Sequence, residues 1–387
     1  MTRTPQTQRR APRRTTVTVA ATITALAVTL AGTALAGHGT HQATREAVEA
    51  AVEDGVPGIT LTARDHHGRW TTTAGVGDLR TGQPRTPADR YRVGSITKTF
   101  VATVLLQLEA EGRLSLDDTV DSWLPGVVHG NGNDGSRITV RQLLNHTSGL
   151  YDYTSDPDFA RAHFTADGFL GHRYDTHTPA DLIAVALRHA PHFTPGDGWS
   201  YSNTNYLLAG EVIEAVTGRP YGDEIRARVI RPLHLTATSV PGTRPDVPEP
   251  SSRAYSRLAA TSPTGRTYDV TRFNPSIAGA AGEMISNSTD LSRFYTALLR
   301  GELLPPEQLK EMKTTVAARN EGYGLGLASR DLTCGLRVWG HGGGIYGSLT
   351  ESATTADGRH TVSFNLNGDW TGGTGAILEA EFCGGSR

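Results

Sequence analysis

Two segments near the start of the chain alternate between apolar and polar residues. Residues 58–63 read Gly-Ile-Thr-Leu-Thr-Ala, and residues 69–74 read Arg-Trp-Thr-Thr-Thr-Ala. A period of two places every second side chain on the core face of a strand, and the polar residues 65–68 between the segments suit a tight turn. The pattern therefore predicts a β-hairpin that opens the fold.

The C-terminal region carries further strand signals, whereas the middle of the chain has helical spacing. Glycine-rich turns separate strand candidates at 336–339, 349–354 and 360–366, and a helix is expected at 374–382. Between the two ends, the expected helices are 97–111, 140–145, 179–189, 203–217 and 288–300. Long loops are expected at 126–137 and 237–275. We expect the strands from both ends to share one sheet.

The first 36 residues differ in composition from the rest. They contain five arginines and no acidic residue, and their apolar run over 17–35 closes on Ala34-Leu35-Ala36. This arrangement is typical of a signal peptide cleaved after Ala36, so we expect a secreted chain. The Arg13-Arg14 pair leaves twin-arginine export open beside the general secretory route. An uncleaved membrane anchor is the alternative, although the apolar stretch is short and alanine-rich for a spanning helix.

Charge and cysteine content then restrict the classes of function that the sequence allows. Without the five leader arginines, 32 of the 37 basic residues remain against 39 acidic residues, which leaves a charge of about −7. A nucleic-acid-binding surface is therefore not expected, and neither is a stable membrane span after cleavage. The two cysteines, Cys334 and Cys383, have one possible intramolecular pairing in an exported chain. We expect a disulfide between them, with a catalytic thiol as the weaker alternative.

The lysine content is the first chemical signal. The chain has 34 arginines but three lysines, and Lys98 stands three positions after Ser95. Arginine stays protonated at any ordinary pH, whereas a buried lysine can lose its proton and act as a base. A helix that begins at this motif would place the hydroxyl and the amine on one side, with free N–H groups available to an oxyanion. The same residues also fit a serine near a helix start beside a solvated lysine.

Two more motifs could complete a site. Tyr201-Ser202-Asn203 stands just before an expected helix and delivers a phenol and an amide together, although a capping Asn beside a packed Tyr has the same pattern. His341 precedes the glycines 342–344 at the predicted end of a strand. Glycines there let a substrate approach the backbone and leave N–H groups available, while a simple strand-ending turn is the alternative.

In this order, Ser-x-x-Lys, Tyr-Ser-Asn and His-Gly-Gly resemble the motifs of the serine β-lactamase-like and penicillin-binding superfamily. The likeness is greatest to the exocellular D-alanyl-D-alanine carboxypeptidases and class C β-lactamases. It covers nearly the whole chain after the leader, including residues 91–95, 112–118, 143–150 and 323–327.

The resemblance implies an α+β fold with two lobes. An antiparallel sheet flanked by helices would be built from residues 41–100 and 275–387, and the inserted lobe of residues 101–274 would be mainly helical. The active site is then expected in the cleft between the lobes.

The resemblance also implies catalytic roles. Ser95 is expected to be the nucleophile that accepts an acyl group, with Lys98 and Tyr201 as its proton-transfer partners. His341 occupies the place where many relatives carry lysine. A lysine of ordinary pKa, about 10.4, is neutral in about one molecule in 2,500 at pH 7, so a base role requires a strongly lowered pKa. Either Lys98 or a Tyr201 phenolate could be the base.

The remaining expected roles concern the substrate. Asn203 and Gly343 would contact it, and the N–H groups of Ser95 and Gly344 would form the oxyanion hole. This chemistry requires no metal or organic cofactor, because the protein supplies the nucleophile, the base and the oxyanion donors. The histidines, among them the His66-His67 pair, lack a metal-ligand spacing.

The family pattern is broken at the positions that decide the substrate. In the exocellular carboxypeptidases, a C-terminal carboxylate is recognised partly by an arginine and by threonines, and the corresponding positions here are Ala328, Gly342 and Gly344. Arg330 or Arg337 could substitute. Carboxypeptidase specificity is therefore the weakest part of the resemblance.

The leading hypothesis is a secreted active-site-serine hydrolase, a D-alanyl-D-alanine carboxypeptidase or transpeptidase that acts on cell-wall peptides and is acylated by β-lactams. The alternative is an esterase, β-lactamase or D-aminopeptidase or amidase of the same superfamily. A non-catalytic β-lactam or wall-peptide binding protein is a second alternative, for which loss of Ser95, Lys98 or Tyr201 would be expected. All three are present.

Overall fold

The computed structural model describes residues 1–2, 41–258, 265–318, 321–371 and 373–384. The expected signal peptide, apart from its first two residues, lies outside the described residues. The strands that build the main sheet are β1 (Gly58–Asp65), β2 (Gly68–Asp78), β3 (Gln83–Pro84), β10 (Val316–Ala318), β11 (Glu321–Tyr323), β12 (Ala328–Asp331), β13 (Arg337–Ile345), β14 (Ser348–Thr355) and β15 (Thr361–Leu366). The α-helices are α1 (Gln42–Glu53), α2 (Thr97–Ala110), α3 (Val120–Trp123), α4 (Val140–Leu144), α5 (Pro157–Phe164), α6 (Ala166–His172), α7 (Pro179–Leu187), α8 (Asn203–Thr217), α9 (Tyr221–Ile225), α10 (Ser288–Leu299), α11 (Pro306–Met312) and α12 (Thr374–Cys383).

Short elements complete the connections. The two-residue strands pair as β4 (Tyr91–Arg92) with β9 (Ile285–Ser286), β5 (His129–Gly130) with β6 (Asn133–Asp134), and β7 (Tyr255–Ser256) with β8 (Tyr268–Asp269). The single-turn helices are η1 (Gly94–Ile96), η2 (Gly135–Arg137), η3 (Tyr153–Ser155), the π-helical η4 (Arg226–Ile230), η5 (Pro275–Ile277) and η6 (Gly279–Ala281).

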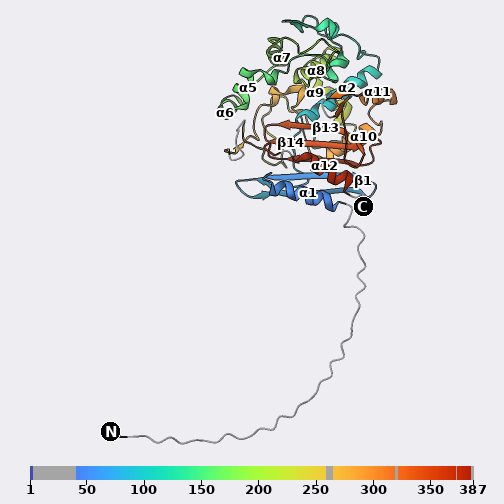
Figure 1. The fold of residues 1–387 in the computed structure, drawn as a ribbon. Helices are drawn as coiled ribbons and strands as arrows, with labels where there is room; N and C mark the ends of the chain where they lie inside the picture. Colours follow the sequence, from blue (N-terminus) through green and yellow to red (C-terminus); the bar gives the residue numbers. More distant parts are fainter. Residues whose placement is uncertain (3–40, 259–264, 319–320, 372, 385–387) are drawn as a thin grey trace. The chain divides into compact units, whose positions relative to one another are not determined.

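The main sheet joins the two ends of the chain. Its strand order is β10-β11-β12-β13-β14-β15-β1-β2-β3, and β1 pairs antiparallel with β15 in the register Ile59↔Leu366. Figure 1 shows the blue β1 and the red C-terminal elements side by side. The predicted class, an antiparallel sheet flanked by helices, is confirmed.

Helices cover both faces of this sheet. Val48 of α1 and Phe382 of α12 pack with Ile59 and Phe364 of the central strands in one apolar core. On the other side, α10 contacts β1, β14 and β15. The six residues of β15 are all buried, as expected for a strand enclosed between two helical layers.

The helical elements surround α2 and α8. Phe100, Leu105, Tyr206 and Ile213 from these two helices belong to one large core, and each is fully buried. Local signals set their ends: α8 stops at Gly218, whose φ of +70° is the left-handed conformation that favours glycine. None of the described helices is both long and apolar enough to span a membrane.

The structure corrects two parts of the predicted pattern. The strand expected at 336–339 continues through the glycines 342–344 to Ile345, because each glycine pairs with a residue of β14. His341 therefore lies inside a strand and not at its end. The helices α1, α3, α5, α6, α9 and α11 were not predicted, since five of them have eight or fewer residues and offer little periodicity.

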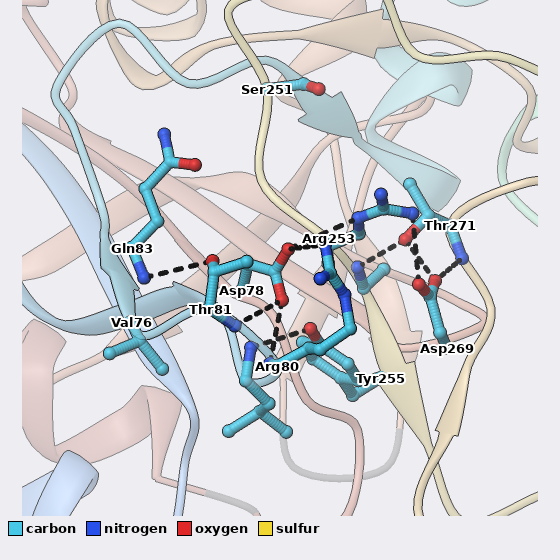
Figure 2. Close-up of polar contacts among 12 residues, drawn as sticks. Val76, Asp78, Arg80, Thr81, Gln83, Ser251, Arg253, Tyr255, Asp269 and Thr271 are labelled. Atoms are coloured by element: carbon cyan, nitrogen blue, oxygen red, sulfur yellow. Dashed lines mark hydrogen bonds and ion pairs between the residues drawn. The ribbon is translucent and has the colours of Figure 1, made fainter.

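The loop expected at 237–275 contains the β7–β8 pair, which polar side chains fasten to the β2–β3 turn (Figure 2). Arg253 contacts Asp269 at 3.1 Å and Asp78 at 3.8 Å, and the Tyr255 hydroxyl accepts the backbone N–H of Leu79 at 2.8 Å. The expected disulfide is present: Cys334 and Cys383 are joined with an S–S distance of 2.02 Å, which ties the turn before β13 to the end of α12.

Candidate active site

Ser95 lies in the turn η1, which leads directly into α2. Two glycines let this turn lie against β13. A Cβ on Gly94, whose φ is +53°, would come within 2.8 Å of the Gly344 nitrogen, and a Cβ on Gly343 would come within 1.9 Å of the Val93 carbonyl oxygen. Because neither position tolerates a side chain, the serine stands directly beside the glycine segment of the strand.

Lys98 is fully buried one helical turn further on, and its amine has three oxygen neighbours. Nζ lies 3.0 Å from Ser95 Oγ, 2.8 Å from Asn203 Oδ1 and 2.7 Å from the carbonyl oxygen of Ala281. Burial lowers the pKa of Lys98 to about 7, and the nearby Asp152 charge opposes this shift.

These contacts orient a neutral Lys98. The oxygens of Asn203 and Ala281 can only accept, so they take the two N–H bonds of an uncharged amine. The nitrogen lone pair is then left for the third neighbour, the Ser95 hydroxyl. In its neutral form, Lys98 is therefore placed to accept a hydrogen bond from the Ser95 hydroxyl.

Asp152 is a site residue that the sequence analysis missed. The Asn203 Nδ2 group donates to Asp152 Oδ2 at 3.0 Å, and the Thr154 backbone N–H donates to Asp152 Oδ1 at 3.1 Å. Burial raises the pKa of Asp152, while its hydrogen bonds and the Lys98 charge lower it. Asp152 stands two residues after the segment 143–150 of the resemblance, but no spacing within the sequence singles it out.

Tyr201 lies against the same amine. Lys98 Nζ is 4.9 Å from the centre of the Tyr201 ring, and the phenol is hydrogen-bonded to Ser95. Burial raises the pKa of Tyr201, and the hydrogen bond to Ser95 only partly offsets this. The phenol is therefore neutral near pH 7, whereas the Lys98 amine, with a pKa of about 7, is divided between its neutral and charged forms.

His341 belongs to a buried chain of hydrogen bonds. Its Nε2 lies 2.8 Å from the Tyr323 hydroxyl, and that hydroxyl lies 3.2 Å from His146 Nε2. The His341 Nδ1 bonds to the carbonyl oxygen of Gly342. Burial, together with the Lys98 charge, lowers the pKa of His341 to about 4, so this imidazole is neutral near pH 7.

The donors and acceptors in this series of hydrogen bonds can be assigned from His146, which lies at the end opposite His341. His146 Nδ1 accepts the Ser202 backbone N–H at 3.3 Å, so the proton of a neutral His146 is on Nε2 and points at Tyr323. The Tyr323 hydroxyl then donates to His341 Nε2, which places the His341 proton on Nδ1. Both ring nitrogens of His341 are thus engaged by protein groups.

Predicted site residues line two cavities. One of about 350 Å³ is lined by Ser95, Asn203 and Gly344. Its apolar walls are Phe164, Leu258, Ile277, Ile345, Tyr346 and Leu349. The other, of about 390 Å³, is lined by Tyr201, His341 and Gly342 together with Ala328, Arg330, Glu351 and further residues. The structure thus brings Ser95, Lys98, Tyr201 and Asn203 into contact, while His341 reaches Tyr323 and not Ser95.

A possible metal-binding group lies elsewhere. Asp65, His66 and His67, on the turn between β1 and β2, each offer one ligand atom, and these atoms lie within 4.8 Å of one another. Both histidines are exposed, and the group has no contact with the cavities described above.

The chain is similar to solved structures of two amidases. The crystal structure of a D-stereospecific amidohydrolase from Streptomyces sp. is 60% identical, with a TM-score of 0.84, over 89% of this chain and 99% of that chain. A D-amino acid amidase from Ochrobactrum anthropi SV3, solved with L-phenylalanine amide, is 28% identical, with a TM-score of 0.74, over 87% of this chain and 97% of that chain.

Penicillin-binding protein 4* of Bacillus subtilis is 28% identical over 317 residues, which are 76% of this chain. They are 64% of that protein, so the match spans less than two thirds of this relative's length. Residues 42–365 match the family model described as Beta-lactamase. The chain therefore belongs to the beta-lactamase family, within the superfamily of serine hydrolases that includes penicillin-binding proteins, esterases and D-amino acid amidases.

Proposed function

We propose that this protein is an exported serine amidohydrolase that cleaves amides of D-amino acids through an acyl-enzyme on Ser95. The observation that carries the proposal is the buried Lys98 amine, which lies 3.0 Å from Ser95 Oγ and within 2.8 Å of the acceptor oxygens of Asn203 and Ala281. The 60% identity to a D-stereospecific amidohydrolase supports the substrate class. Export rests on the leader composition.

The proposed reaction begins with Lys98 as the base. Ser95 Oγ attacks the amide carbon while its proton moves to Lys98 Nζ, and the N–H groups of Ser95 and Gly344 hold the carbonyl oxygen as it becomes negative. The C–N bond then breaks, and the leaving amine takes a proton from the Tyr201 hydroxyl, which regains one from Lys98. Water attacks the acyl-enzyme in the reverse sequence and releases the acid.

The residues around Gly342, which would contact the leaving group, favour a simple amide substrate over a peptide that ends in a D-alanine carboxylate. Here Gly342 stands where carboxypeptidases carry an anion-recognising side chain, and Glu351 pairs with it across the strands. A Cβ on Gly342 would lie 3.0 Å from Glu351 Oε2, so a carboxylate already occupies this space. The site therefore has no room here for the side chain that recognises a leaving-group carboxylate in those enzymes. This supports the amidase alternative over the D-alanyl-D-alanine carboxypeptidase that the motifs first indicated.

The acyl side suits an apolar residue. The Ser95 cavity has mainly aromatic and aliphatic walls, and Asp369 is the one carboxylate among the described residues that line it. Asp369 Oδ2 accepts the backbone N–H of Gly347 at 2.8 Å, which fixes the carboxylate beside the β13–β14 turn. An acidic group here favours a substrate with a free amine over one with an acidic acyl part.

The test compares D-phenylalanine amide with L-phenylalanine amide, a D-Ala-D-Ala peptide, a p-nitrophenyl ester and nitrocefin, with mass spectrometry of the trapped enzyme. We expect selective hydrolysis of the D-amide and an acyl group on Ser95, both lost in Ser95→Ala. Faster release of D-alanine from the peptide would instead favour the carboxypeptidase. Rapid nitrocefin or ester turnover without D-amide turnover would favour the β-lactamase or the esterase, and a stable penicilloyl adduct without any turnover would favour the binding protein.

A further inference from the structure

Among the described residues, no hydrogen bond joins Asp152 to Ser95 or to Lys98. Asp152 instead contacts Asn203, whose side chain lies between Asp152 and Lys98. Both of its carboxylate oxygens lie within hydrogen-bond distance of Asn203 Nδ2, at 3.3 Å and 3.0 Å. An amide has one donor end and one acceptor end, so a carboxylate on one side decides which end faces the other side. With Nδ2 held by Asp152, Oδ1 must face Lys98.

The opposite orientation would change the state of Lys98. An Asn203 turned by 180° would direct Nδ2 at the amine, and a neutral Lys98 could meet that donor only with its lone pair. The lone pair would then no longer face the Ser95 hydroxyl. The orientation of Asn203 therefore determines whether Lys98 can accept the serine proton.

The backbone holds Asp152 in place independently of Asn203. Asp152 is the N-terminal cap of η3, where its Oδ1 accepts the Thr154 N–H, and the Thr154 hydroxyl adds a further contact to Asn203 at 3.4 Å. This loop and α8 are 51 residues apart in the sequence, and the Thr204 hydroxyl fastens them together by donating to the Tyr151 carbonyl at 2.8 Å. The carboxylate is therefore positioned before a substrate arrives.

We propose that Asp152 is a positioning residue, which fixes the orientation of Asn203 and thereby directs the Lys98 lone pair to Ser95. This inference deepens the proposed function and rests on the same acylating serine. It assigns no proton transfer to Asp152, because the carboxylate acts only through Asn203 and through its charge.

The charge effect has a defined sign. The groups that face Lys98 are Asp152, the rings of Tyr201 and Tyr206, and the imidazoles of His146 and His341. Burial keeps the phenols and imidazoles neutral near pH 7, so Asp152 is the anion that raises the pKa of Lys98 against the effect of burial. Removing this charge must lower the Lys98 pKa further, and the acidic limb of the pH–rate profile must move to lower pH.

The experiment measures Ser95 acylation by p-nitrophenyl butyrate from pH 4 to 10, because a simple ester reports serine activation whatever the natural substrate. In Asp152→Asn, which keeps the size but removes the charge, we expect the acidic limb to shift to lower pH. In Asp152→Ala, which also frees Asn203, we expect kcat to fall by between about tenfold and 100-fold with little change in KM, as for a misplaced catalytic group. If Asp152 had a purely structural role, the Asp152→Asn substitution would not shift the acidic limb of the pH–rate profile.

Asp156→Asn is the matched control. Asp156 is a buried capping aspartate at the start of the neighbouring helix α5, and its contacts are with Phe159, His189 and Arg188. Its profile should coincide with that of the unchanged protein. An unshifted acidic limb in Asp152→Asn would overturn the inference, and so would full kcat in a folded Asp152→Ala. Failure of the proposed function is a separate result, namely normal ester acylation without hydrolysis of any D-amide.

Discussion

Replacing Lys98 by methionine removes the buried amine but keeps a side chain of similar length, and its effect on stability should reverse with pH. Burial lowers the pKa of Lys98 from 10.5 in the unfolded chain to about 7 in the fold. Between these values the folded protein binds fewer protons than the unfolded chain, so this group destabilises the fold fully below pH 7 and the penalty disappears as the pH rises through 10.5. At about 1.36 kcal/mol for each tenfold change, the penalty is about 5 kcal/mol at pH 6 and about 1 kcal/mol at pH 10.

Methionine also deletes three hydrogen bonds, and this loss does not depend on pH. Ser95, Asn203 and Ala281 each lose the Nζ partner, at about 1 kcal/mol each. The balance predicts that Lys98→Met is about 2 kcal/mol more stable than the unchanged protein at pH 6 and about 2 kcal/mol less stable at pH 10, while being inactive.

Urea unfolding of the two proteins at pH 6, 8 and 10 measures this reversal, because titrations elsewhere in the chain are common to both and cancel. The exposed Lys310 on α11 provides the control, since Lys310→Met should differ from the unchanged protein by no more than about 0.5 kcal/mol at each pH. A stability difference for Lys98→Met that stays constant from pH 6 to 10 would refute the depressed pKa and with it the role of Lys98 as base.

Five further outcomes are expected. D-amide turnover should rise with pH through about 7, as Lys98 becomes neutral, and Lys98→Arg should be soluble but acylate far more slowly; near-normal acylation would remove Lys98 from the mechanism. Replacing both disulfide cysteines by serine should lower the free energy of unfolding by about 4 kcal/mol, given the sequence separation of 49 residues, and an unchanged urea midpoint would contradict this. Nitrogen NMR should find the His341 proton on Nδ1 in the unchanged protein and on a mixture of both nitrogens in Tyr323→Phe, whereas a proton on Nε2 in the unchanged protein would refute the direction of the chain. Glu351→Thr should increase release of D-alanine from a D-Ala-D-Ala peptide by about tenfold or more relative to D-amide hydrolysis, because it opens the space beside Gly342, and an unchanged ratio would show that Glu351 does not select against the peptide.

Local pattern was sufficient for the parts of the site that lie close together in the sequence. Ser95 and Lys98 are three residues apart, and helical geometry alone brings such side chains to one side. The order of the three motifs added the family, and alternation of apolar residues predicted most of the sheet. The chemistry of a lysine-poor chain also identified which amine to examine, because a neutral amine has no counterpart in arginine.

The error at His341 shows where local pattern was insufficient. Glycines were interpreted as the end of a strand because they have little intrinsic preference for one, yet β13 continues through them because β14 and the Ser95 turn supply partners on both sides. Intrinsic preference is weak compared with hydrogen bonds to neighbouring strands, and those neighbours are not visible within a short window of sequence.

The sequence by itself therefore determined the fold class and singled out the serine that we propose as the nucleophile and the lysine beside it, since helical period and motif order are properties of neighbouring residues. Only the tertiary structure decided the burial of that amine and the residues that contact it. Asp152 meets Asn203 across 51 residues, and Tyr323 meets His146 across 177. Burial and hydrogen-bond direction depend on which distant segments pack together, and no periodicity along the chain encodes those distances.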